Sequence, residues 1–208
     1  RFTPTHDRLA PKSSWNAGQI SDTRYAYEVV VNGPLRSMIK IKGMNWNTDK
    51  GSYAYEQYYS AIAKQSYTAS KVVFTTFSPE SPDVRMGVGF RKKPEENHFV
   101  QKDGIVISSG PEEIRDPENI DDRKAQRVEF IGTALIVKDI YKPVYQFVED
   151  HRGNHTFRIE NPQDQSFEFM LSSAWSEGAV YNNAKDFSDY IIKTGLEYNN
   201  PIQTRFVQ

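Results

Sequence analysis

The chain has 208 residues, with 26 basic and 27 acidic side chains, no cysteine and an aromatic content of 13%. The lack of cysteine excludes a disulfide framework, a thiolate nucleophile and cysteine-ligated metal centres. A net charge of -1 gives no electrostatic footprint for nucleic acid or an anionic membrane surface, and no run approaches the about 18 apolar residues of a membrane span. We therefore expect neither nucleic acid nor a membrane as a partner.

Most of the chain alternates between apolar and polar residues with a period of two, which predicts half-buried antiparallel strands. The first strand, residues 25–31, ends at an Asn-Gly-Pro turn, and residues 35–42 return as its hairpin partner. The other strands expected from this period are, in chain order, 52–63, 71–77, 84–90, a short strand at 99, 105–107, 128–137, 144–148, 156–159 and 167–171. About ten or eleven strands separated by turn residues predict an all-β sandwich or barrel.

One segment near the end has helical spacing instead. Its apolar residues recur from Ala184 to Thr194, Asn183 is placed to cap the first turn, and Gly195 is a plausible stop. A final strand is expected at residues 202–207, after Pro201.

Two polar segments interrupt the strands. Residues 1–20 show no period and are expected to form an N-terminal strap or linker before a single β-sandwich domain at 21–208. Residues 111–126 are acidic and contain two prolines, and we interpret them as an excursion loop because strands flank them on both sides.

The excursion loop offers hard oxygen ligands of the kind that calcium takes. Its candidate ligands are Asp116, Glu118, Asn119, Asp121 and Asp122. Their spacing departs from the calcium-loop motif, so a solvated loop is the default interpretation. Calcium stays open, and no other cofactor is expected.

Histidines are the natural candidates for proton transfer near neutral pH. His98 is our candidate base, because it lies at the entry to a predicted strand, where a side chain can face a binding surface. His151 and His155 lie four apart and could ligate a metal, but Gly153 and Asn154 lie between them. We interpret that segment as an exposed hairpin turn and not as a metal site.

Aromatic and cationic side chains recur together on the predicted strands. Aromatic faces stack on sugar rings, and arginine forks hold carboxylates with two hydrogen bonds. The same tyrosines would also suit a sheet with no binding role. The candidates for an acidic-sugar site are Tyr55, Tyr59, Arg36, Arg85, Trp46 and Trp175.

Three segments carry a resemblance to known proteins. Residues 25–37 run from a strand through Asn-Gly-Pro to an arginine and resemble the opening of supersandwich proteins related to galactose mutarotase. Residues 130–137 (FIGTALIV) add to the likeness, as does the Ser-Ala-Trp-Ser of residues 173–176. Together they resemble the carboxyl-terminal half of an uncharacterised bacterial family encoded among genes for pectin and ulvan breakdown. The resemblance implies an all-β antiparallel β-supersandwich with one C-terminal helix.

The resemblance also implies an activity: β-elimination at a uronic acid by a carbon–oxygen lyase or dehydratase, on an acidic oligosaccharide, in the periplasm or outside a bacterial cell. Such a reaction requires a cation at the carboxylate, a base for the C5 proton and an acid for the leaving oxygen. The candidate roles are Arg36 or Arg85 for the carboxylate, His98 as base, Tyr55 or Tyr59 as acid or base, and Trp46 with Trp175 as a stacking platform.

Members of the resembled family are longer, so we expect this chain to be the C-terminal part of a longer protein. The missing N-terminal half, or another chain, is then a candidate partner. Two other functions stay open. One is a non-catalytic carbohydrate-binding or structural module, and the other is a glycoside hydrolase, which needs two carboxylates about 5–5.5 Å or 6.5–9.5 Å apart. The histidine and glutamate pair of true mutarotases finds no match here, so epimerisation of a free sugar is not expected.

Overall fold

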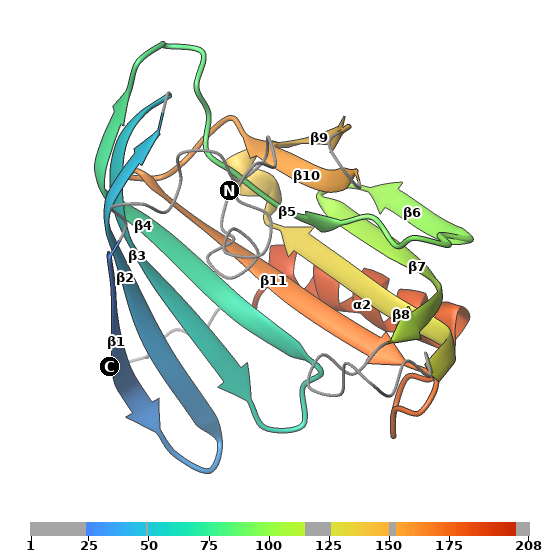
Figure 1. Cartoon of the computed structure of the whole chain (residues 1–208). Coiled ribbons are helices and arrows are strands. Elements are labelled where there is room, and N and C mark those ends of the chain that lie inside the picture. Colours follow the sequence, from blue (N-terminus) through green and yellow to red (C-terminus); the bar gives the residue numbers. More distant parts are fainter. Residues whose placement is uncertain (1–23, 49, 115–125, 150–152, 203–208) are drawn as a thin grey trace, which may run out of the picture.

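The structure is a computed structural model that describes residues 24–48, 50–114, 126–149 and 153–202. Within these ranges the chain forms an eight-stranded antiparallel sheet, a three-stranded antiparallel sheet and one long helix near the C-terminal end (Figure 1). The predicted β-rich class with a C-terminal helix is therefore confirmed. Each strand expected from the period-two pattern overlaps one strand of the structure.

The eight-stranded sheet consists of two halves joined by one strand. Strands β1 to β4 lie side by side in chain order, β8, β7 and β6 form the other half, and β11 lies between β4 and β8. Across the sheet the bounds are β1 (Arg24–Asn32), β2 (Arg36–Thr48), β3 (Gly51–Ile62), β4 (Tyr67–Pro79), β11 (Ser166–Trp175), β8 (Gln126–Val137), β7 (Ile105–Ile114) and β6 (His98–Lys102). The predicted β1–β2 hairpin is present, with Glu28 opposite Lys40.

The three-stranded sheet covers one face of the large sheet at its β6–β8 end (Figure 1). Its strands, in spatial order, are β5 (Gly87–Arg91), β10 (Asn154–Ile159) and β9 (Pro143–Val148), and a short 3-10 helix at Asp139–Tyr141 connects β8 to β9. Phe157 and Ile159 of β10 are almost fully buried against Val106 and Leu135 of the large sheet. This shared core fixes the two sheets face to face.

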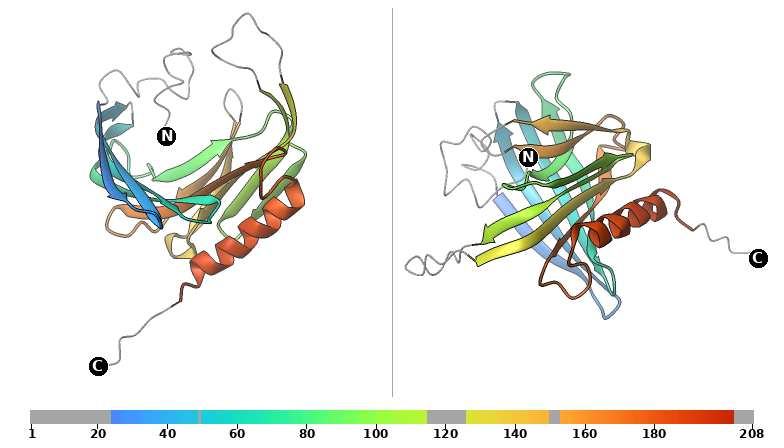
Figure 2. Two further views of the ribbon diagram at one scale, coloured as in Figure 1. Left: turned by 90° about the horizontal axis from the view of Figure 1, so that it is seen from below. Right: turned by 90° about the vertical axis from the view of Figure 1, so that its right-hand side faces the viewer.

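The helix α2 (Ala184–Asn199) covers the opposite face of the same half of the large sheet, as the two views of Figure 2 show. The predicted cap is confirmed, because the backbone N–H of Asp186 donates to Asn183 Oδ1 at 2.9 Å. Phe187 and Ile191 are fully buried against the sheet. Among the described residues, no helix is both long and apolar enough to cross a membrane.

The predicted stop at Gly195 is wrong, because the helix continues to Asn199. A Cβ at Gly195 would lie 2.5 Å from Ile105 Cδ1, so this glycine lets the helix lie close to the sheet. The predicted start of the excursion loop is wrong as well. Residues 111–114 continue β7, since Glu112 pairs with Val128 of β8.

Several expectations concern residues that the structure does not describe. They are the N-terminal strap at 1–20, residues 203–207 of the predicted final strand, and the loop residues 115–125 with all five candidate calcium ligands.

Candidate functional site

His155 lies on the inner face of the three-stranded sheet, where it is only 3% exposed. The interpretation of its segment as an exposed turn was wrong for this residue, because β10 already begins at Asn154. Gly153, at φ +72°, takes the left-handed backbone conformation just before the strand. His151 lies outside the described residues. In the sheet, Phe90 of β5 and Phe147 of β9 lie directly opposite His155 on either side.

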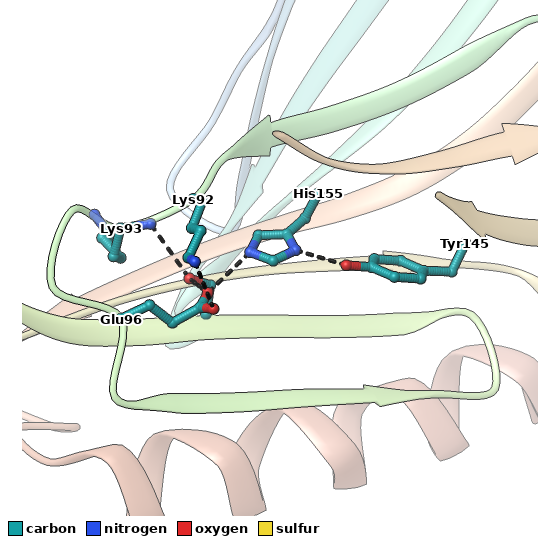
Figure 3. Close-up of polar contacts among 6 residues, drawn as sticks. Lys92, Lys93, Glu96, Tyr145 and His155 are labelled. Atoms are coloured by element: carbon teal, nitrogen blue, oxygen red, sulfur yellow. Dashed lines mark hydrogen bonds and ion pairs between the residues drawn. The ribbon is translucent and has the colours of Figure 1, made fainter. Parts of the chain in front are cut away.

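Both ring nitrogens of His155 have a polar partner (Figure 3). The Tyr145 hydroxyl lies 2.8 Å from Nδ1, and Glu96 Oε2 lies 2.9 Å from Nε2. The Ser108 hydroxyl donates to the same oxygen of Glu96. Because a carboxylate only accepts hydrogen bonds, these partners assign the proton to Nε2, and Nδ1 then accepts from the Tyr145 hydroxyl. We call this chain of three residues the Tyr145–His155–Glu96 relay.

The relay joins the two sheets. Tyr145 comes from β9 and His155 from β10 of the small sheet, whereas Glu96 comes from the turn before β6 of the large sheet. This turn lies tightly against β7, since a Cβ at Gly110 would fall 2.1 Å from the carbonyl oxygen of Glu95. Because Gly110 of β7 has no side chain, the turn can pack against this strand, and Glu96 of the turn then reaches the imidazole of His155.

Aromatic rings surround the imidazole. Phe99 of β6 stacks on it with ring centroids 4.9 Å apart and planes at 23°, and the rings of Phe90 and Phe147 lie 5.6 and 5.3 Å away. Phe99 and Phe147 are 42% and 41% exposed. The buried histidine thus lies beneath two half-exposed aromatic side chains.

Burial and charge set the protonation states of the relay. Removal from water lowers the pKa of His155 below its ordinary value, and this outweighs the opposing effect of Glu96, while the charge of Lys92 lowers it further. Burial, and then the charge of Glu96, raise the pKa of Tyr145. At neutral pH the imidazole is therefore neutral and the phenol protonated. This arrangement can exchange a proton through the tyrosine oxygen.

A family model described as a domain of unknown function (DUF4861) matches residues 12–204 of the chain. The chain belongs to the DUF4861 family. No curated protein matches it, and no solved structure does. The match includes both sheets, the helix and every residue of the relay.

In this DUF4861 domain the candidate base His98 lies on the other face of β6 from the relay. Its Nε2 is 2.9 Å from the Ser188 hydroxyl of α2. Successive side chains of a strand point to opposite faces, so Phe99 contacts His155 while His98 contacts the helix. His98 thus links the sheet to α2.

The candidate tyrosines also lie apart from the relay. Tyr55 and Tyr59 are on β3, which β4, β11, β8 and β7 separate from β6. Tyr55 is 3% exposed and packs with Trp46 and Phe74, with ring centroids 5.9 and 6.2 Å away. Burial raises the pKa of both tyrosines.

The candidate arginines do not converge on one site. Arg36 begins β2 and donates to the Ser60 hydroxyl at 3.3 Å. Arg85 precedes β5, donates to the carbonyl of Pro82, and lies 3.8 Å from a Glu160 oxygen. Glu160 follows the last residue of β10, whereas His155 is near its first, so Arg85 and the relay lie at opposite ends of that strand.

The two candidate tryptophans do not form one platform. Trp46 pairs with Tyr53, which in turn pairs with Phe77 near the end of β4. Trp175 lies three residues beyond Ser172, which pairs with Tyr67 at the start of β4. The tryptophans are therefore at opposite ends of the large sheet. Trp175 is 44% exposed.

Sequence reasoning missed Tyr145 and Glu96. A signal for Tyr145 was present, because antiparallel pairing of residues 143–148 with residues 154–159 brings residues 145 and 147 to the same face as His155. No local signal marks Glu96 as the partner of His155, which is 59 residues away. Within the described ranges, no three His, Asp or Glu side chains come together as metal ligands.

Proposed function

We propose that this DUF4861 domain is a carbohydrate-active enzyme that acts on uronic-acid-containing oligosaccharides by β-elimination, as a lyase or dehydratase. The observation that supports a catalytic role best is the Tyr145–His155–Glu96 relay. A neutral, buried histidine that accepts from a tyrosine hydroxyl and donates to a carboxylate is suited to accepting and returning one proton. The resemblance to polysaccharide-breakdown proteins supplies the substrate class.

In the proposed reaction Tyr145 is the group that meets the substrate, since it is half-buried whereas His155 is buried. The C5–H bond breaks and its proton passes to the Tyr145 oxygen, while the phenolic proton moves to Nδ1 of His155. The electron pair forms the C4–C5 double bond, and the C4–O bond breaks. Tyr145 then protonates the leaving oxygen and takes back its own proton from Nδ1. Glu96 stabilises the imidazolium that forms in between.

For the architecture, we propose the antiparallel β-supersandwich related to galactose mutarotase, of which this chain would be the carboxyl-terminal part. The support is the stacking of a three-stranded on an eight-stranded antiparallel sheet, together with the sequence resemblance.

The function is tested by incubating the protein with uronate-bearing oligosaccharides and following the ultraviolet absorbance of the conjugated double bond, with mass spectrometry of the products. We expect absorbance to rise, with loss of one water for a dehydratase or chain cleavage for a lyase. Tyr145→Phe, which removes only the hydroxyl, should reduce kcat by about 10²–10⁴-fold.

The matched control is Tyr181→Phe, which removes a hydroxyl from a tyrosine stacked on Tyr190 of α2 and should leave kcat unchanged. Unchanged sugars with wild-type protein, together with calorimetric binding of the same sugars, would replace the enzyme by a carbohydrate-binding module. Full activity of the folded Tyr145→Phe variant would exclude the relay from the reaction.

A further inference from the structure

Lys92 is a cation beside the relay, and its ammonium keeps hydrogen-bonding capacity for a ligand. Its Nζ lies 4.0 Å from Glu96 Oε1, and its side chain is 41% exposed. An ion pair of that length and exposure contributes little, and the ammonium has three donors. The neighbouring Lys93 differs, since its Nζ donates to Glu112 at 3.3 Å and its side chain is only 15% exposed.

The Lys92 ammonium also lies beside an exposed aromatic ring. Its Nζ is 5.8 Å from the centroid of Phe147, and Phe147 is 41% exposed. One side of this ring rests on the backbone of Gly153, where a Cβ would lie 2.5 Å from Phe147 Cζ. The ring is thus packed against the residue just before β10 while part of it faces solvent.

Main-chain pairing fixes these two groups relative to the relay. The N–H of Lys92 donates to the Gly153 carbonyl at 3.1 Å, which continues the β5–β10 ladder by one residue. Phe147 lies opposite His155 on β9. A cation, an aromatic surface and the Tyr145 hydroxyl therefore surround the same imidazole, as Figure 3 shows for Lys92 and Tyr145.

We propose that Lys92 and Phe147 form the subsite for an anionic sugar ring, with Lys92 on the carboxylate and Phe147 against the apolar face of the ring. The subsite rests on the proposed function only for the identity of the reacting sugar. A cation beside an exposed aromatic ring is an arrangement typical of ligand sites, in which few polar groups orient a ligand against an apolar surface. In the proposed β-elimination the positive charge of Lys92 neutralises the carboxylate, which acidifies the adjacent C5 proton.

The test measures binding separately from turnover. Two probes are used, an oligosaccharide with a terminal glucuronate and the same oligosaccharide with that carboxyl group reduced to an alcohol. Calorimetry compares wild type, Lys92→Gln, Lys92→Arg and the control Lys93→Gln, which removes the same charge at the neighbouring position. We expect Lys92→Gln to weaken binding of the glucuronate probe about tenfold or more, the size of one hydrogen bond between charged groups.

Binding of the reduced probe should be the same in wild type and Lys92→Gln, and Lys92→Arg should retain most of the affinity for the anionic probe. Added salt should weaken the wild type more than Lys92→Gln. Equal affinity of Lys92→Gln and wild type for the glucuronate probe would overturn the subsite, as would an equal loss for both probes. Anion-selective binding through Lys92 without any elimination would instead refute the proposed reaction and retain the subsite.

Discussion

At the scale of single residues, the relay places one buried polar side chain, His155, among aromatic residues. On the inner face of the small sheet, His155 stands between two phenylalanines, and Phe157 follows it toward the core. A buried polar side chain is costly unless it is hydrogen-bonded, and here every polar atom of the imidazole has a partner. Because the imidazole is buried, its contribution to the free energy of unfolding depends on pH.

Because burial lowers the pKa of folded His155 below 6.5, the unfolded chain takes up a proton first as the pH falls. Above pH 6.5 both states are neutral at this residue, and it adds no pH dependence. Below that value the free energy of unfolding should fall, by at most about 1.4 kcal/mol per pH unit, until the folded histidine is protonated. Urea unfolding of wild type and His155→Gln from about pH 7 to about pH 5 should show a shallower decline in the variant.

The control for this experiment is His98→Gln, which replaces a histidine on the helix face of β6 and leaves the relay in place. Among the described residues, Glu96, Tyr145 and Lys92 are titratable groups that act on His155, and all three are retained in both variants. Parallel pH profiles for wild type and His155→Gln would contradict the prediction.

The relay also marks where sequence reasoning ends at this scale. In this segment the sequence offers His98 as the candidate base, two residues away from Glu96. Alternation shows that His98 and Phe99 point to opposite faces, yet it does not tell which face meets the small sheet. That choice depends on the packing of β10 over β6, a contact between residues far apart in the chain.

At the scale of elements, the strands and the capped helix were predictable because their signals are local. Period-two alternation and an Asn-Gly turn define β1 and β2, and Asn183 caps α2. The placement of β11 between β4 and β8 was not predictable, since it depends on tertiary packing. Gly195 shows the same limit: a glycine near a helix end is a usual stop signal, and only the neighbouring Ile105 reveals its role in packing.

Gly132 is a second glycine, after Gly195, that allows close packing between α2 and the large sheet. A Cβ at Gly132 of β8 would lie 2.6 Å from Phe187 Cδ1 and 2.9 Å from Phe130 Cζ. Phe187 is fully buried, so its ring has no free space to enter. We expect Gly132→Ala to lower the free energy of unfolding by about 1–3 kcal/mol, the usual effect of overpacking, as measured by urea titration.

The matched control is Gly33→Ala in the β1–β2 turn, where the nearest atom to an added Cβ is the Arg36 carbonyl oxygen at 3.4 Å. This variant should change stability by about 0.5 kcal/mol or less. A Gly132→Ala protein as stable as Gly33→Ala would show that α2 can move away from β8 at no cost.

At the scale of the whole molecule, the large sheet separates two cores. The small sheet packs on one face, around Phe157 and Leu135, and α2 packs on the other, around Phe187 and Ile107. The relay lies on the small-sheet side and takes its residues from both sheets. Its geometry therefore exists only when the first core is intact.

Phe157 tests this dependence because it is 1% exposed at the centre of the core between the sheets. Phe157→Ala should cost about 3–5 kcal/mol of stability. Because the two sheets share this core, far-ultraviolet circular dichroism and tryptophan fluorescence should report one common transition at a lower urea concentration with an unchanged m value.

Binding of the glucuronate probe should be lost over that same transition, since Phe147 is on β9 and Lys92 directly follows β5 of the small sheet. If Phe157→Ala instead lost binding well before the fluorescence of the large sheet changed, the small sheet would be a separately unfolding unit, and the relay would depend on a local opening equilibrium.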